Sequence, residues 1–202
     1  MQVSCGDVGQ SGRGTVFYAS KSSFACGENM ASSCHYLEVA PNGWNGNTVK
    51  CPNTNNCETS DWGDYGPGAG LGYWYCYMDA DDEALIPNAS GTVIGSGYTN
   101  TSAMLTVCDP SNAAETSRGY NGGGMTDWSL PSIDELNALY YYGGRNAIGG
   151  FAADKYWSSS QSKYWSSSQS DADNAWQQDF ANGEQWTIDN INIRGVRAVR
   201  AF

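Results

Sequence analysis

The chain has 202 residues, including 8 Trp, 13 Tyr and 25 Gly, and only 15% of its side chains are charged. This aromatic content is enough for a packed core, which argues against a disordered chain, and the length fits a single domain over residues 1–202. The formal net charge of −11 disfavours nucleic acid and anionic membranes as partners.

The N-terminal part predicts two short strands. Residues 12–18 (GRGTVFY) and 36–39 (YLEV) combine β-branched and aromatic side chains, and Pro41 ends the second strand. No apolar run of 18 residues occurs, so we expect no membrane insertion. The start, MQVSCGD, lacks the apolar region of a signal peptide. Either a leader is missing or the protein leaves its cell by lysis, as virion components do.

All seven cysteines lie within the first 108 residues. Two pairs flank short polar loops, which is typical of disulfides in an oxidising, extracellular setting. Zinc is disfavoured because no Cys-x-x-Cys motif occurs and His35 is the only histidine. Cys5 is left over, either free or paired with another chain. The expected disulfides join Cys26 to Cys34, Cys51 to Cys57, and Cys76 to Cys108.

The densest acidic cluster follows a loop rich in Gly, Asn and Pro. We interpret it as solvated surface carboxylates. One alternative is a Ca²⁺ site, although the cluster lacks the glycine and the distant Glu of an EF-hand. Another is a carboxyl pair for glycoside hydrolysis. Our expectation is no cofactor and no enzyme activity, with Ca²⁺ as the weaker alternative. The cluster consists of Asp79, Asp81, Asp82 and Glu83.

Helical signals occupy the middle of the chain. Residues 101–108 (TSAMLTVC) predict a helix with Asn100 as N-cap, and residues 112–118 predict a second helical stretch after Pro110. The strongest signal is Ser132 three residues before Glu135, a capping box directly ahead of Leu136. That helix should run from Ile133 to about Tyr142 and stop at Gly143-Gly144.

From Phe151 onward the pattern changes to strands. Asn182-Gly183 predicts a hairpin turn between NAWQQDF and EQWTI, and Val196–Phe202 predicts the last strand. KYWSSSQS occurs twice in tandem, at residues 155–162 and 163–170. Because eight is even, one extra copy preserves the alternation of faces along a strand. Strands, then helices, then strands indicate an α+β fold.

Several segments, taken in this order, resemble the DUF1566, or Lcl C-terminal-like, family of bacterial and phage domains. They are GTVFYAS, FACGENMASSCHYLEVAP, IGSGYTNTSAM, TDWSLPSIDELNALY, IGGFAADKYWSSS and VRAVRAF. The resemblance implies a C-type-lectin-like fold, with two short helices packed on small antiparallel sheets and long irregular loops. It also implies extracellular ligand binding or adhesion.

Many such domains are variable proteins of diversity-generating retroelements. The resemblance places a variable, ligand-binding region at about residues 162–194. Trp128, Trp157, Trp176 and Phe180 match framework positions. The residues that would face a ligand are Asp171, Asp173, Asn174, Gln177, Glu184, Trp186, Ile188, Asn190 and Asn192.

The residues themselves also favour a recognition surface near the C-terminus. Tyr and Trp give rigid contact area, and Ser, Gly and Asn give adaptable hydrogen bonding. We therefore expect a binding protein on a cell surface or virion, with a protein or glycan ligand on a cell surface. Two alternatives stay open, a carboxylate-dependent glycan-active enzyme and a structural subunit of a surface filament or phage tail. Homo-oligomerisation is compatible with each.

Overall fold

The computed structural model describes residues 3–44, 70–73, 85–108, 112–149, 151, 163–190 and 193–202. Within them the chain forms four α-helices and two β-sheets, which confirms an α+β fold. The expected C-type-lectin-like topology stays a prediction, as does the single-domain assignment. The resemblance implied two short helices, whereas the residue patterns predicted three helical stretches, and these correspond to α1 (Gly97–Val107), α2 (Ala113–Arg118) and α3 (Ile133–Tyr141). The fourth, a short helix α4 (Arg145–Ile148) after Gly144, was not predicted.

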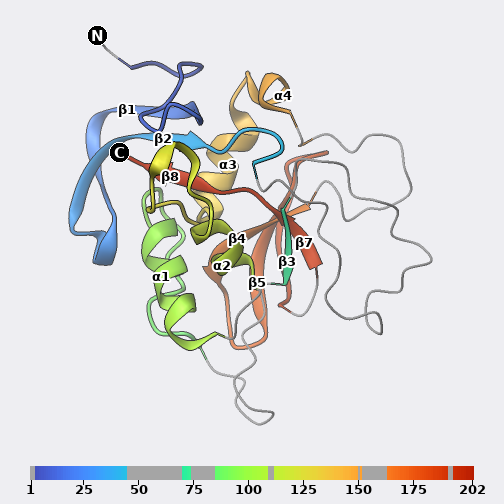
Figure 1. The fold of residues 1–202 in the computed structure, drawn as a ribbon. Coiled ribbons are helices and arrows are strands. Elements are labelled where there is room, and N and C mark those ends of the chain that lie inside the picture. Colours follow the sequence, from blue (N-terminus) through green and yellow to red (C-terminus); the bar gives the residue numbers. More distant parts are fainter. Residues whose placement is uncertain are drawn as a thin grey trace.

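The first sheet joins the two ends of the chain. Strand β1 (Thr15–Cys26) pairs antiparallel with β2 (Ser32–Val39), and β2 pairs antiparallel with β8 (Val199–Ala201). Figure 1 shows the red C-terminal strand lying beside the blue N-terminal strands. Both N-terminal strands are longer than predicted, since Phe24, Ala25 and Cys26 also pair with Cys34, Ser33 and Ser32.

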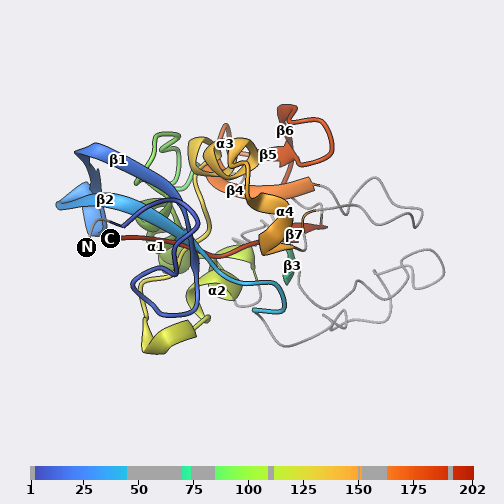
Figure 2. The same cartoon turned by 90° about the horizontal axis from the view of Figure 1, so that it is seen from above.

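The second sheet has the strand order β3-β7-β4-β5-β6. Strands β4 and β7 are parallel, and the other neighbours are antiparallel. The two sheets lie at different sides of the molecule (Figure 2). The strands are β3 (Gly70–Tyr73), β4 (Lys163–Gln169), β5 (Asn174–Asp179), β6 (Gln185–Asp189) and β7 (Ile193–Val196).

The predicted strand over residues 196–202 is wrong in one respect, because it is divided between the sheets. Val196 ends β7 in the second sheet, and Val199 begins β8 in the first. Between them, Ala40 donates its backbone N–H to Ala198. The Arg197 guanidinium also binds the Ala40 carbonyl oxygen at 3.0 Å. These contacts hold the crossing point in the interior.

Two of the described helices begin at a side-chain cap. Helix α3 (Ile133–Tyr141) has the predicted capping box of Ser132 and Glu135, and α2 (Ala113–Arg118) is capped by Asn112. Helix α1 (Gly97–Val107) starts earlier than predicted, after Ser96. Asn100 is therefore not its cap. It lies inside α1, buried, where its side chain bonds both the N–H and the C=O of Gly91.

Two apolar clusters form the core. One surrounds Trp128, Trp165 and Met104. The other brings Leu37 of β2 together with Leu136 of α3 and Phe180 after β5. Because this second cluster combines side chains from both sheets and from α3, it fixes the five-stranded sheet relative to the strands at the chain ends.

Candidate functional site

The β5–β6 hairpin is held at its tip by the predicted Asn182-Gly183 turn. Gly183 has φ of +83° and donates its N–H to Asp179. Asn182 accepts from the Glu184 backbone at 2.9 Å and donates to the Glu184 carboxylate at 3.0 Å. A Cβ on Gly183 would meet the Tyr140 ring at 2.5 Å, so the turn sits directly on α3. These contacts keep the tip in one conformation.

A second turn fixes the other end of the hairpin. One Asp171 carboxylate oxygen accepts from the backbone N–H of Asp173 and Asn174 and from the Asn174 side chain, at 2.8–3.0 Å. These hydrogen bonds, led by that from the Asn174 side chain, lower the pKa of Asp171. Asn190 joins the end of β6 to this turn through Asp173 and Ala172.

The expected ligand-facing residues differ in exposure. Asp171, Asp173 and Glu184 are exposed, and Asn192 lies outside the described residues. The half-buried ones are Asn174, Trp186, Ile188 and Asn190.

Gln177 is the exception among the expected ligand residues, since it is fully buried. Its side-chain oxygen accepts from the Arg194 Nε at 2.5 Å, so it belongs to the framework. Gln177 faces Trp186 across the hairpin, and Ala175 faces Ile188. Because directly opposed residues share one face of a sheet, Trp186 and Ile188 lie on the inner face.

The sequence reasoning missed three exposed positions on β6. Gln185, Thr187 and Asp189 are exposed and alternate with the half-buried Trp186 and Ile188. Gln185 still bonds the carbonyl of Ile133 and the side chain of Gln178. The sequence did contain a signal for them. Polar and apolar residues alternate strictly along QWTID, and this pattern predicts a strand whose polar side chains face solvent.

Strand β4 supports the hairpin from inside. Trp165 and the three serines that follow it are fully buried. Their polar groups are paired, since Ser167 donates its N–H to Pro131 at 2.7 Å and Ser168 donates its hydroxyl to Gly91 at 2.6 Å. Trp128 and Phe180 are buried and Trp176 is half-buried, in keeping with framework roles, while Trp157 lies outside the described residues.

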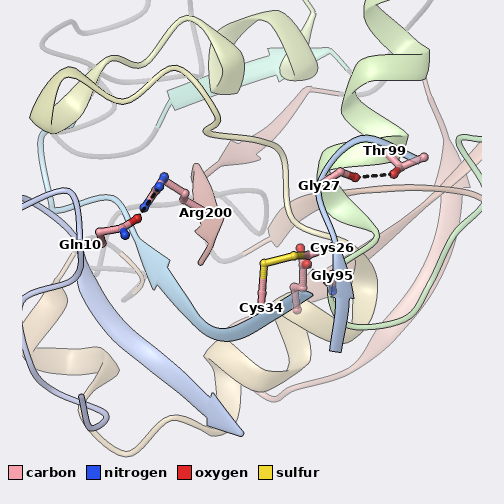
Figure 3. The surroundings of a disulfide bond; sticks show 8 residues. Gln10, Cys26, Gly27, Cys34, Gly95, Thr99 and Arg200 are labelled. Carbon is pink, nitrogen blue, oxygen red and sulfur yellow. Dashed lines mark hydrogen bonds between the residues drawn. A yellow bond between two sulfur atoms is a disulfide. The ribbon is translucent and has the colours of Figure 1, made fainter. Parts of the chain in front are cut away.

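The three C-terminal arginines serve the interior. Arg197 is fully buried, lies 4.3 Å over the Phe151 ring and binds the Gly149 carbonyl oxygen. Burial lowers its pKa. Arg200 forms ion pairs with the buried Glu38 at 2.9 Å and with Asp127 at 2.5 Å. It also binds Gln10, as Figure 3 shows.

A cavity of about 240 Å³ lies beside the Cys26–Cys34 disulfide. Its lining includes Tyr98, Asp127 and Glu135. Burial raises the pKa of Glu135 to about 7, although the N–H groups of Ser132 and Gly95 donate to its carboxylate. Figure 3 shows the disulfide next to Gly95, with Thr99 bound to Gly27 alongside.

Only some of the seven cysteines lie among the described residues. The Cys26–Cys34 disulfide is confirmed, and Cys108 is also disulfide-bonded. Cys5 is exposed and has a free thiol. Cys51, Cys57 and Cys76 lie outside the described residues, so the other two expected pairings stay predictions.

The acidic cluster of Asp79, Asp81, Asp82 and Glu83 also lies outside the described residues, and the Ca²⁺ and glycan-cleavage alternatives stay untested with it. In the part of the chain that the structure describes, no three His, Cys, Asp or Glu side chains are grouped as metal ligands. Nor does that part contain a helix able to cross a membrane.

Comparison with known families decides the affiliation. The profile of the Lcl C-terminal domain matches residues 44–200, well over half of the chain. The chain belongs to the Lcl C-terminal domain family. This family is typical of surface or secreted proteins, and the Cys26–Cys34 disulfide fits an oxidising compartment. A search of curated proteins returned no match.

The Lcl C-terminal domain match begins after the first two strands. Strands β1 and β2 end at Val39, whereas the matched region starts at Trp44. Yet β2 pairs with β8 and Glu38 binds Arg200, both near the other end of the match. The N-terminal hairpin is therefore an integral part of this Lcl C-terminal domain's first sheet.

Proposed function

We propose that this Lcl C-terminal domain is a non-enzymatic binding module that recognises a protein or glycan on a cell surface. Its ligand would contact the hairpin surface, which we define as Asp171, Asp173, Glu184, Gln185, Thr187, Asp189 and Asn190. Trp186 and Ile188 flank this surface and offer the parts of their side chains that stay accessible.

The observation that supports this proposal most is the contrast between a fixed frame and a polar exposed hairpin. Both ends of the hairpin are closed by side-chain hydrogen bonds, those of Asp171 and of Asn182. Between them, β6 presents Gln185, Thr187 and Asp189 to solvent. Because the bound conformation is already held in the free protein, little conformational entropy is lost on binding.

The proposal extends to a C-type-lectin-like fold and to diversification of residues 162–194 by a retroelement. Exposed and half-buried residues alternate along β6, and this supports diversification by a retroelement, because the exposed positions can change without disturbing the buried face. Sequencing of related genomic copies would test it. We expect substitutions at template adenines that are confined to residues 162–194, and a reverse transcriptase gene beside the coding sequence. An even spread of changes over the whole chain would contradict it.

Binding itself can be tested with glycan and cell-surface protein arrays, followed by titration calorimetry on any hit. We expect the triple variant Glu184→Ala, Thr187→Ala, Asp189→Ala to lose at least about tenfold in affinity, about 1.4 kcal/mol. A matched control changes Ser22, Ser23 and Glu28 to Ala, since these are exposed on the N-terminal hairpin. Equal affinities for the two triple variants would disprove the site.

A structural-subunit role is the second candidate, and one observation favours it. Cys5 is exposed and free, so it could join two chains through a disulfide. Partial burial of the sulfur is the main reason why the pKa of the Cys5 thiol is raised. Fewer thiolates are therefore present at neutral pH, and disulfide formation is slower. Covalent dimers on a non-reducing gel that vanish with Cys5→Ser would support this role, and a purely monomeric mass in solution would count against it.

A further inference from the structure

The tandem repeat gives the chain two identical candidates for one central strand. Strand β4 is formed by the second copy of KYWSSSQS, at residues 163–170, and the first copy occupies residues 155–162. We infer that the two copies compete for the β4 position, so that the domain can exchange one for the other by a shift of eight residues.

The contacts of β4 are made by side chains and backbone that the first copy repeats without change. Tyr164 packs against Phe180 with ring centroids 4.9 Å apart, and Trp165 is fully buried in the core. The Gln169 side-chain oxygen accepts from Ile86 at 2.7 Å. Tyr156, Trp157 and Gln161 stand at the same places in the first copy. Exchange therefore preserves the composition of the interior.

The chain connections allow the exchange. Phe151 packs against Tyr164 with ring centroids 5.5 Å apart. After exchange Phe151 would meet Tyr156, five residues along the chain, and five residues can span up to about 17 Å. One connection shortens by eight residues while the other lengthens by eight. Because closure entropy changes only logarithmically with loop length, the two effects largely offset each other.

One set of contacts is not repeated, and it distinguishes the two states. Ser170 and the Asp171 carboxylate close the turn that leads into β5. After exchange, Ser162 takes the place of Ser170, but Lys163 follows it in place of Asp171. The Asp171 turn would therefore open, and residues 163–170 would join the connection at this end of the hairpin surface. Exchange thus changes the surface while it keeps the core.

The decisive test replaces the tryptophan of one copy at a time. In the full chain we expect Trp165→Asp to keep a cooperative thermal transition, because Trp157 moves into the core. Trp157→Asp should also fold, and the variant with both substitutions should not. The matched control is a chain with residues 155–162 deleted, which keeps a single copy. In that single-copy chain, Trp165→Asp should abolish the cooperative thermal transition.

Limited trypsin digestion with mass spectrometry reports which copy occupies the strand, because the strand protects the lysine that begins it. We expect cleavage after Lys155 in Trp157→Asp and after Lys163 in Trp165→Asp. Two results would overturn the inference. One is a Trp165→Asp full chain that is as unfolded as its single-copy counterpart, and the other is the same cleavage site in both folded variants.

Discussion

Glu135 combines two roles at the start of α3, as a capping residue and as a buried acid. Its carboxylate accepts backbone hydrogen bonds from Gly95 and Ser132, yet burial still raises its pKa from 4.5 to about 7. Between these values the folded chain holds a proton that the unfolded chain has released. The stability that this proton contributes is therefore full below about pH 4.5 and is lost as pH rises to about 7.

We expect the free energy of unfolding to fall by up to about 3 kcal/mol across that pH window because of Glu135 alone. Urea unfolding at several pH values would measure it. In Glu135→Gln this part of the pH dependence should disappear. Glu115→Gln, at the equivalent exposed position of α2, should follow the wild-type profile. Parallel pH profiles for Glu135→Gln and wild type would contradict the assignment.

Gly95 is a second residue whose position tolerates no side chain. Its φ is +94°, and an added Cβ would lie 1.9 Å from the Ala25 carbonyl oxygen. Gly95→Ala should therefore lower the free energy of unfolding by more than about 2 kcal/mol, since backbone strain and a steric clash combine. Gly124→Ala is the matched control, with φ of +73° and no atom near the new methyl group. It should cost about 1 kcal/mol, and equal losses would argue against the clash.

At the scale of elements, the β1–β2 hairpin depends on its disulfide. The bridge joins Cys26, the last residue of β1, to Cys34, the third residue of β2, and so closes the tip of the hairpin. Replacing both by Ser should lower stability by about 2–3 kcal/mol, mainly by freeing the unfolded chain. Thermal unfolding with and without reductant would measure it. Cys5→Ser, which breaks no bridge, is the control. A double variant as stable as this control would refute the estimate.

Elements fixed by neighbouring residues could be predicted from the sequence. The capping box of Ser132 and Glu135 and the Asn182-Gly183 turn depend only on residues a few positions apart, and both are confirmed. Asn100 was assigned as an N-cap because it resembles one locally. Its actual partner, Gly91, lies in a loop whose approach to α1 is set by tertiary packing.

The exposure of the expected ligand-facing residues was predictable only in part. The turn residues Asp171 and Glu184 are exposed where expected. Gln177 was assigned to the ligand face through the family resemblance, yet Arg194 gives it a buried partner that no local pattern reveals. The same limit applies to residues 196–202, since two sheets compete for them and only the packed core decides where the strand divides.

At the scale of the whole molecule, the family-matched region is not expected to fold alone. Removing residues 1–43 would strip β8 of its partner β2 and leave Arg200 without Glu38. Loss of one partner of a buried ion pair costs about 3–5 kcal/mol, comparable with the total stability of a small domain. A fragment of residues 44–202 should show no cooperative unfolding by circular dichroism. A cooperative transition would show that residues 44–202 fold without the β1–β2 hairpin, which would then be an addition to a self-sufficient domain.

The pairing of Leu37 with Ala201 also has a consequence for the order of events during synthesis. Contacts between residues so far apart in the chain close slowly, and these cannot close until Val199–Ala201 have left the ribosome. Strand β2 must therefore wait, with one edge unpaired, while more than 150 residues are added. A chain released before Val199 would leave β2 without the neighbour that covers this edge.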